Sequence, residues 1–155
     1  MRHLPAQPRK TLRRDARALV ETCAGWNSRL AARRISQFLD RELASTGLTT
    51  ARLGLMAQIA AAADDTLGAL ARRTGLDQST LSRNLRTLEN ADLIEIAVVE
   101  SDLRRRAVWL TETGARRLEA ALPLWRKAHG KLGRRLSSPL VRRLAKETET
   151  LESEA

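Results

Sequence analysis

Between Leu76 and Asn90, hydrogen-bonding side chains recur at the spacing of one face of an α-helix. Drawn at 100° per residue, this face collects Ser79, Arg83, Arg86 and Asn90, and it carries no acidic residue. Arginine can pair with guanine, and asparagine with adenine, through two hydrogen bonds in the major groove of DNA. The face therefore has the chemistry to read base edges. The other interpretation is an ordinary solvated helix face.

Two short helices must position this face. The opposite side of the same segment carries three leucines that predict a buried stripe: Leu81, Leu85 and Leu88. Asp77 stands at the N-cap position, and Gly75 stands where a preceding helix would stop. Residues 66–73 form that preceding amphipathic segment. Two short helices joined by a tight glycine-containing turn predict a helix-turn-helix, whose second helix enters the major groove.

The second helix supplies the predicted recognition set, and all of its members are polar. They are Gln78, Ser79, Thr80, Ser82, Arg83, Arg86 and Asn90. We expect the three hydroxyls to hold phosphates rather than bases, because most polar protein–DNA contacts go to the backbone.

A β-hairpin is predicted directly after this helix. Residues 93–99 are apolar and β-branched, residues 100–106 form a polar tip, and residues 107–110 return as a second strand. The tip carries three consecutive arginines, Arg104, Arg105 and Arg106. Beside a helix-turn-helix, such a wing is expected to contact phosphates or the minor groove, although a charge run can also be a solvated surface.

The flanking segments predict a mainly α fold with a small β-hairpin wing. We expect a flexible basic arm over residues 1–10, an N-terminal dimerisation helix over 11–46, the winged helix-turn-helix over 47–111 and C-terminal dimerisation helices over 112–155. A helix of about 35 residues, bent near Gly25, would span about 50 Å, more than a small domain covers alone. Its apolar positions are therefore expected to pack against a second chain.

Composition narrows the class of protein. The 155-residue chain has a net charge of +10 and is 43% hydrophobic, which suits a folded protein with a polyanionic partner. It contains no tyrosine and only 3% aromatic residues, so stacking on single-stranded bases is not expected as the main binding mode. The polar N-terminus, the lack of a long hydrophobic run and the single cysteine predict a cytoplasmic protein without an internal disulfide.

With these elements placed, the chain resembles the MarR (multiple antibiotic resistance regulator) family. The stretch from Asp102 to Gly114 matches the family pattern D-x-R-x-x-x-(apolar)-x-L-T-x-x-G at every fixed place. The stretch from Leu76 to Glu89 resembles L-x-x-S-T-(apolar)-(S/T)-R…L-E, and the resemblance covers about residues 28–135. Two departures are Asp92, where the family mostly has glycine, and Ile96, where an arginine is usual.

The resemblance implies a dimeric winged-helix regulator that binds a near-palindromic operator and is released by a small ligand or another signal. A repressor is the usual role in this family. It also implies that Arg104 reaches the minor groove while Asp102 holds it by a salt bridge. The partners expected are therefore double-stranded DNA, a second copy of the chain and a small-molecule effector, with no membrane and no cofactor.

Two further sites keep alternatives open. Cys23 lies near the position of the reactive cysteine in peroxide-sensing members of the family, but no tyrosine surrounds it here, and an inert cysteine in the dimer interface is the alternative. Four apolar residues could line a ligand pocket or simply belong to the core: Trp26, Met56, Trp109 and Trp125.

Other classes of function find little support. No set of residues has metal-ligand spacing, and no nucleophile or phosphate-loop pattern is present, so we do not expect an enzyme. A dimeric interaction scaffold that no longer binds DNA is the alternative from another class. The positive charge kept by Arg83 and Arg86 argues against it.

Overall fold

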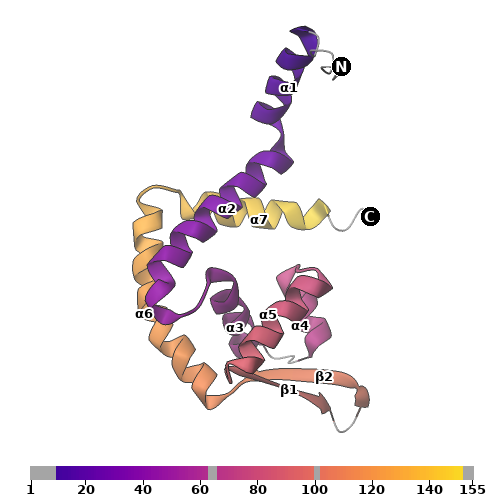
Figure 1. The fold of residues 1–155 in the computed structure, drawn as a ribbon, viewed down its shortest axis with the longest axis vertical. Helices are drawn as coiled ribbons and strands as arrows, with labels where there is room; N and C mark the ends of the chain where they lie inside the picture. The colour runs from indigo at the N-terminus through magenta and orange to yellow at the C-terminus, as the bar shows by residue number, and fades with distance from the viewer. Residues whose placement is uncertain (1–9, 63–65, 100–101, 152–155) are drawn as a thin grey trace, which may run out of the picture. The chain divides into compact units, whose positions relative to one another are not determined.

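The computed structural model describes residues 10–62, 66–99 and 102–151. The chain forms two compact units, Met1–Phe38 and Leu39–Ala155. The predicted basic arm lies outside the described residues except for Lys10. The helices and strands follow in the order α1 (Lys10–Thr22), α2 (Ala24–Leu43), a 3-10 helix η1 (Ala44–Thr46), α3 (Thr50–Ala61), α4 (Leu67–Thr74), α5 (Gln78–Asn90), β1 (Ile94–Val99), β2 (Asp102–Leu110), α6 (Glu112–Gly133), α7 (Ser138–Thr148) and η2 (Glu149–Leu151) (Figure 1). The predicted mainly α fold with a β-hairpin is confirmed.

In the first unit, the long N-terminal helix is interrupted at Cys23 rather than at Gly25. The helical hydrogen bonds from Cys23 N to Leu19 O and from Asn27 N to Cys23 O persist across the interruption. The Asn27 side chain donates to the carbonyls of Glu21 and Cys23, each at 3.1 Å, and so satisfies oxygens that the break would leave free. The interruption is therefore local and well hydrogen-bonded.

The second unit is built around the packing of α3, α4 and α5 beside the hairpin (Figure 1). Leu81, Leu85 and Leu88 are all buried, as their spacing predicts. They join a core that includes Leu43, Leu53, Leu55, Met56, Ile59, Leu70, Leu93, Ile94, Val108 and Leu118. Helix α3 contributes Leu53, Leu55, Met56 and Ile59 to it, whereas the adjacent Ala60 is exposed.

The hairpin is antiparallel, with Ile94 paired to Leu110 and Val98 to Arg106. A register shift follows between Val98 and Val99. The return strand begins at Asp102, so the expectation that it begins at Ala107 is wrong. The three arginines therefore lie within a strand and not in a polar tip, and the described side chain among them, that of Arg106, is exposed.

The turn from α5 into the hairpin is a Schellman motif centred on Asp92. Asp92 N donates to Glu89 O and Leu93 N donates to Leu88 O, each at 2.9 Å, while the buried side chains of Leu88 and Leu93 belong to the same core. Asp92 has a φ of 55°, the left-handed conformation that glycine adopts without strain. Thr111 Oγ1 donates to the Asp92 carbonyl at 2.6 Å, which ties the end of β2 to the turn.

We expect Asp92→Gly to raise the free energy of unfolding by about 0.5–1 kcal/mol, because glycine removes the Cβ strain of a left-handed residue. The loss is small, since the exposed Asp92 carboxylate accepts only a long hydrogen bond, 3.4 Å from Thr113 Oγ1, among the described residues. Urea denaturation measures the change. Asp92→Ala is the control, because it keeps the strain and should be less stable than the wild type. A glycine variant less stable than the wild type would contradict this explanation.

Of the C-terminal helices, α6 packs on the core through Leu118 and Ala121, whereas α7 has no buried residue. Within this unit, Arg117 of α6 donates to Thr46 O at 3.0 Å, and Lys131 forms an ion pair with Glu42. Pro123 lies inside α6, which bends along its length (Figure 1). Ser137 occupies the N-cap of α7, but its side chain makes no capping hydrogen bond. On α7, the large apolar residues Leu140, Val141 and Leu144 remain exposed. In the first unit, α1 likewise exposes Leu12, Leu19 and Val20.

Candidate nucleic-acid interface

Local capping interactions position α4 and α5 as the sequence predicts. Thr66 Oγ1 accepts a hydrogen bond from Ala69 N at 3.3 Å and begins α4, which ends at Gly75 in the left-handed conformation. Thr66 also bridges to Ala107, so the start of α4 is joined to β2. Asp77 then caps α5 by accepting from Thr80 N at 2.8 Å. The helix-turn-helix is therefore held both by its own caps and by the hairpin.

The two faces of α5 have opposite environments. One is the buried leucine stripe, and the other exposes six of the seven predicted recognition residues: Gln78, Ser79, Ser82, Arg83, Arg86 and Asn90. Thr80 is half-buried. Neither Arg83 nor Arg86 forms an ion pair with any described residue, so both guanidinium groups face solvent without an acidic partner in residues 10–62, 66–99 and 102–151.

The first turn of α5 carries a hydrogen-bond network that the sequence did not predict. Ser79 Oγ donates to Asp77 Oδ1 and Thr80 Oγ1 donates to Asp77 Oδ2, each at 2.7 Å. These hydroxyls, with the Thr80 N–H, hold the pKa of the Asp77 carboxyl well below its usual range. The sequence signal that could have indicated this network is an N-cap aspartate followed by hydroxyl side chains two and three residues later. The contact with phosphate predicted for these hydroxyls stays a prediction.

The wing contributes one described basic side chain. Arg106 is exposed in β2 opposite Val98, whereas its neighbour Ala107 is buried. The side chains of Asp102, Arg104 and Arg105 lie outside the described part of the chain, so the predicted salt bridge and minor-groove contact stay predictions.

One groove is lined by residues of α4, α5 and β2. Its volume is about 570 Å³. It is lined by Leu67, Gly68, Ala71, Leu76, Gln78, Leu81, Ser82, Leu85 and Arg106. Two predicted recognition residues, Gln78 and Ser82, thus share one surface depression with wing residue Arg106. Residues from α4, α5 and β2 that are distant in sequence form this surface.

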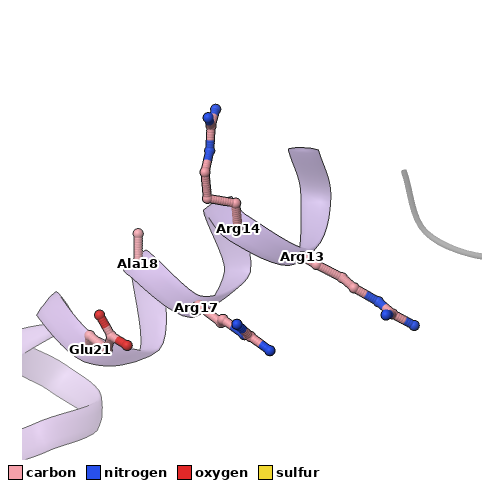
Figure 2. A pocket seen from close by; sticks show the side chains of 5 residues that line it. All are labelled: Arg13, Arg14, Arg17, Ala18 and Glu21. Atoms are coloured by element: carbon pink, nitrogen blue, oxygen red, sulfur yellow. The ribbon is translucent and has the colours of Figure 1, made fainter. Parts of the chain in front are cut away.

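A second, shallow groove of about 420 Å³ runs along α1. Figure 2 shows its arginines projecting from the helix into open space, with Arg13 and Arg17 on one side and Arg14 on another. Ala18 and Glu21 complete the lining. Because one helix supplies every lining residue, the groove has no opposing wall that could enclose a ligand.

The remaining predicted residues lie in different environments. Cys23 is half-buried with a free thiol, and its Sγ accepts a hydrogen bond from Trp26 N at 3.4 Å, so it acts as the N-cap of α2. Met56 is fully buried in the core, while Trp109 and Trp125 are partly exposed on β2 and α6. The Trp125 ring lies 4.5 Å from the His129 ring. The predicted ligand pocket and the redox role of Cys23 stay predictions.

The described residues contain neither a metal-binding group nor a membrane-spanning helix. Within them, no three or more His, Cys, Asp or Glu side chains form a group that could hold a metal ion. No helix among them has the length and apolar character needed to span a membrane.

Comparison with known proteins places this geometry in a family. The model of the MarR family matches residues 46–105, which contain α3, α4, α5 and the start of the hairpin. The transcriptional regulator MosR from M. tuberculosis, solved in complex with DNA, is 32% identical; the match covers 84% of this chain and 97% of MosR with a TM-score of 0.76. No curated protein matches the chain's sequence.

Two more distant structures share the fold. MepR from S. aureus, solved in complex with DNA, is 22% identical over 85% of this chain and 98% of MepR, with a TM-score of 0.68. A mutant of MarR from E. coli, solved with operator DNA, is 23% identical over 86% of this chain and 96% of that one, with a TM-score of 0.72. With the family model on the helix-turn-helix and nearly the whole length of MosR matched, the chain belongs to the MarR family of winged-helix transcriptional regulators.

Proposed function

We propose that this MarR-family regulator binds double-stranded DNA sequence-specifically through α5 and the β1–β2 hairpin. The observation that carries the proposal is the division of α5 into a buried leucine face and an exposed face with Arg83, Arg86 and Asn90. The net charge of +10 favours a polyanion, and MosR, 32% identical, was solved in complex with DNA. Arg83 and Arg86 are assigned to base edges, and the wing arginines to backbone and minor groove.

The protein would act as a homodimer on a near-palindromic operator. Two reading helices must reach successive major grooves about 34–36 Å apart, which one chain cannot do with a single α5. The apolar faces left exposed on α1 and α7 support this assembly, because Leu19 is 63% exposed and Leu140 is 51% exposed in the single chain. Pairing through the terminal helices would bury these faces.

We propose that the protein acts in the cytoplasm as a repressor. A small ligand or another signal would release it from the operator. A ligand that binds better to a form with a different spacing of the two reading helices would lower operator affinity by shifting the populations. Neither repression nor release by a ligand requires a cofactor or a catalytic residue.

The test is equilibrium binding of the full chain to a duplex from its own upstream region and to a shuffled duplex of the same length. We expect the upstream duplex to bind at least about a thousandfold more tightly near physiological salt, and both affinities to fall steeply as salt rises. Equal affinity for both duplexes would contradict sequence-specific recognition. No binding even at low salt would favour the interaction-scaffold alternative.

A further inference from the structure

The N-terminus of α5 carries an exposed carboxylate at the place where a recognition helix would meet the DNA backbone. The N–H groups at a helix N-terminus are a natural binding site for phosphate. Here Asp77 already occupies that position and accepts from Thr80 N at 2.8 Å. Any phosphate approaching the end of this helix therefore meets a fixed negative charge.

The hydroxyl groups beside it are committed to the same carboxylate. Serine and threonine each have a single O–H donor, and a phosphate oxygen can only accept. The donors of Ser79 and Thr80 both point to Asp77, one to each carboxylate oxygen, at 2.7 Å. In this arrangement neither hydroxyl can also donate to phosphate, although their residue types at these positions suggested that role.

We propose that Asp77 is an electrostatic brake on DNA binding: it repels the phosphate backbone at the N-terminus of α5 and withholds the Ser79 and Thr80 hydroxyls from it. This rests on the proposed DNA-binding function. Because backbone contacts carry no sequence information, the brake lowers affinity for operator and unrelated DNA by the same factor. Base selection is left to residues further along the exposed face, Arg83 and Arg86 in particular.

The charge state of Asp77 supports a constant brake rather than a switch. Three hydrogen bonds donated to the carboxylate lower the pKa of Asp77, so the group stays ionised throughout the neutral range. The nearest arginines on the same helix, Arg83 and Arg86, make no ion pair with it. Across the described ranges, no other basic side chain forms an ion pair with this carboxylate either.

The test measures the binding of full-length Asp77→Asn to the upstream duplex and to the shuffled duplex across a range of salt concentrations. Asparagine is as good an N-cap as aspartate, so thermal unfolding should show a folded protein. We expect about fivefold tighter binding to both duplexes. This is about the effect of removing the repulsion between one carboxylate and one nearby phosphate in a medium with the dielectric constant of water. The slope of the logarithm of the binding constant against the logarithm of the salt concentration should become steeper by about one unit. Glu149→Gln is the matched control, because it removes the same charge from the exposed η2 segment, outside the helix-turn-helix.

A double-mutant cycle tests the hydroxyl part of the proposal. Thr80→Ala should cost more affinity in the Asp77→Asn background than in the wild-type background. In wild type the Thr80 hydroxyl donates to Asp77 Oδ2. The asparagine NH2 that replaces Oδ2 cannot accept, so only in this background is the Thr80 hydroxyl free to donate to phosphate. Additive effects of the two substitutions would overturn this step.

Three outcomes would overturn the brake. If Asp77→Asn lowered only thermal stability and left both affinities unchanged, Asp77 would be a helix cap alone. If it weakened binding to the upstream duplex alone, the carboxylate would read a base, as it can accept from cytosine N4. If the wild type bound neither duplex, the proposed function itself would fail. In the first two cases the wild type still binds DNA, so that function stands.

Discussion

Gly114→Ala is expected to destabilise the protein by at least about 4 kcal/mol, most of the stability of a small domain. A Cβ atom at this position would lie 1.8 Å from the Leu93 carbonyl oxygen and 2.8 Å from its carbonyl carbon. Both are backbone atoms, so no flexible side chain can move aside. Gly114 is buried in the first turn of α6, where its N–H donates to Thr111 Oγ1 at 2.9 Å.

The surrounding structure cannot relax at low cost. The Leu93 carbonyl also accepts from Thr111 N at 3.2 Å, and Leu93 N closes the turn after α5. Moving Leu93 away from the new methyl group would therefore disturb the end of α5, the start of the hairpin and the cap of α6 together. Because the turn at Leu93 joins α5 to the β1–β2 hairpin, we expect the unfolding to disrupt the proposed DNA-binding surface as well.

The same helix provides a matched control. Gly130 lies inside α6, and a Cβ atom added there would meet nothing within 4 Å, so Gly130→Ala should raise the free energy of unfolding by about 0.5–1 kcal/mol. Urea denaturation followed by circular dichroism measures both variants. A Gly114→Ala protein as stable as the wild type would show that the close contact between α6 and Leu93 is absent in solution.

The features that the sequence predicted correctly depend on short-range rules. Caps act over three residues and a helix face repeats every three or four, so Asp77, Gly75 and the leucine stripe can be recognised from the local sequence. The resemblance marks Asp92 as a departure from the family's glycine, and the structure shows that its backbone still adopts the left-handed conformation that favours glycine.

The features that were missed depend on contacts between distant residues or on exposure. The reason for glycine at position 114 is Leu93, twenty-one positions earlier, which no local pattern reveals. The polar first residues of β2 are typical of a loop, yet the strand begins at Asp102, which pairs with Val99 beyond a register shift that hydrophobicity does not predict. The commitment of the Ser79 and Thr80 hydroxyls to Asp77 is a matter of side-chain orientation, which residue types alone do not determine.

Arg83→Ala is expected to reduce operator affinity by about ten- to hundredfold and to leave stability nearly unchanged. The size is that of one bidentate arginine–guanine contact, about 1–3 kcal/mol. Arg83 is exposed on α5 and makes no ion pair with the described residues, so its removal leaves no buried group unpaired. Substitution of Arg105 in the wing, assigned to the backbone, by alanine should instead weaken binding to all DNA alike and reduce the salt slope by about one unit.

Whether the exposed face of α5 reads bases can be decided by a single set of binding constants. Dissociation constants of wild type, Arg83→Ala and Arg105→Ala are determined for the upstream duplex and for the shuffled duplex at one salt concentration. We predict that Arg83→Ala loses at least about tenfold on the upstream duplex and less than about threefold on the shuffled one. Equal losses of Arg83→Ala on both duplexes would show that α5 does not read bases through this arginine.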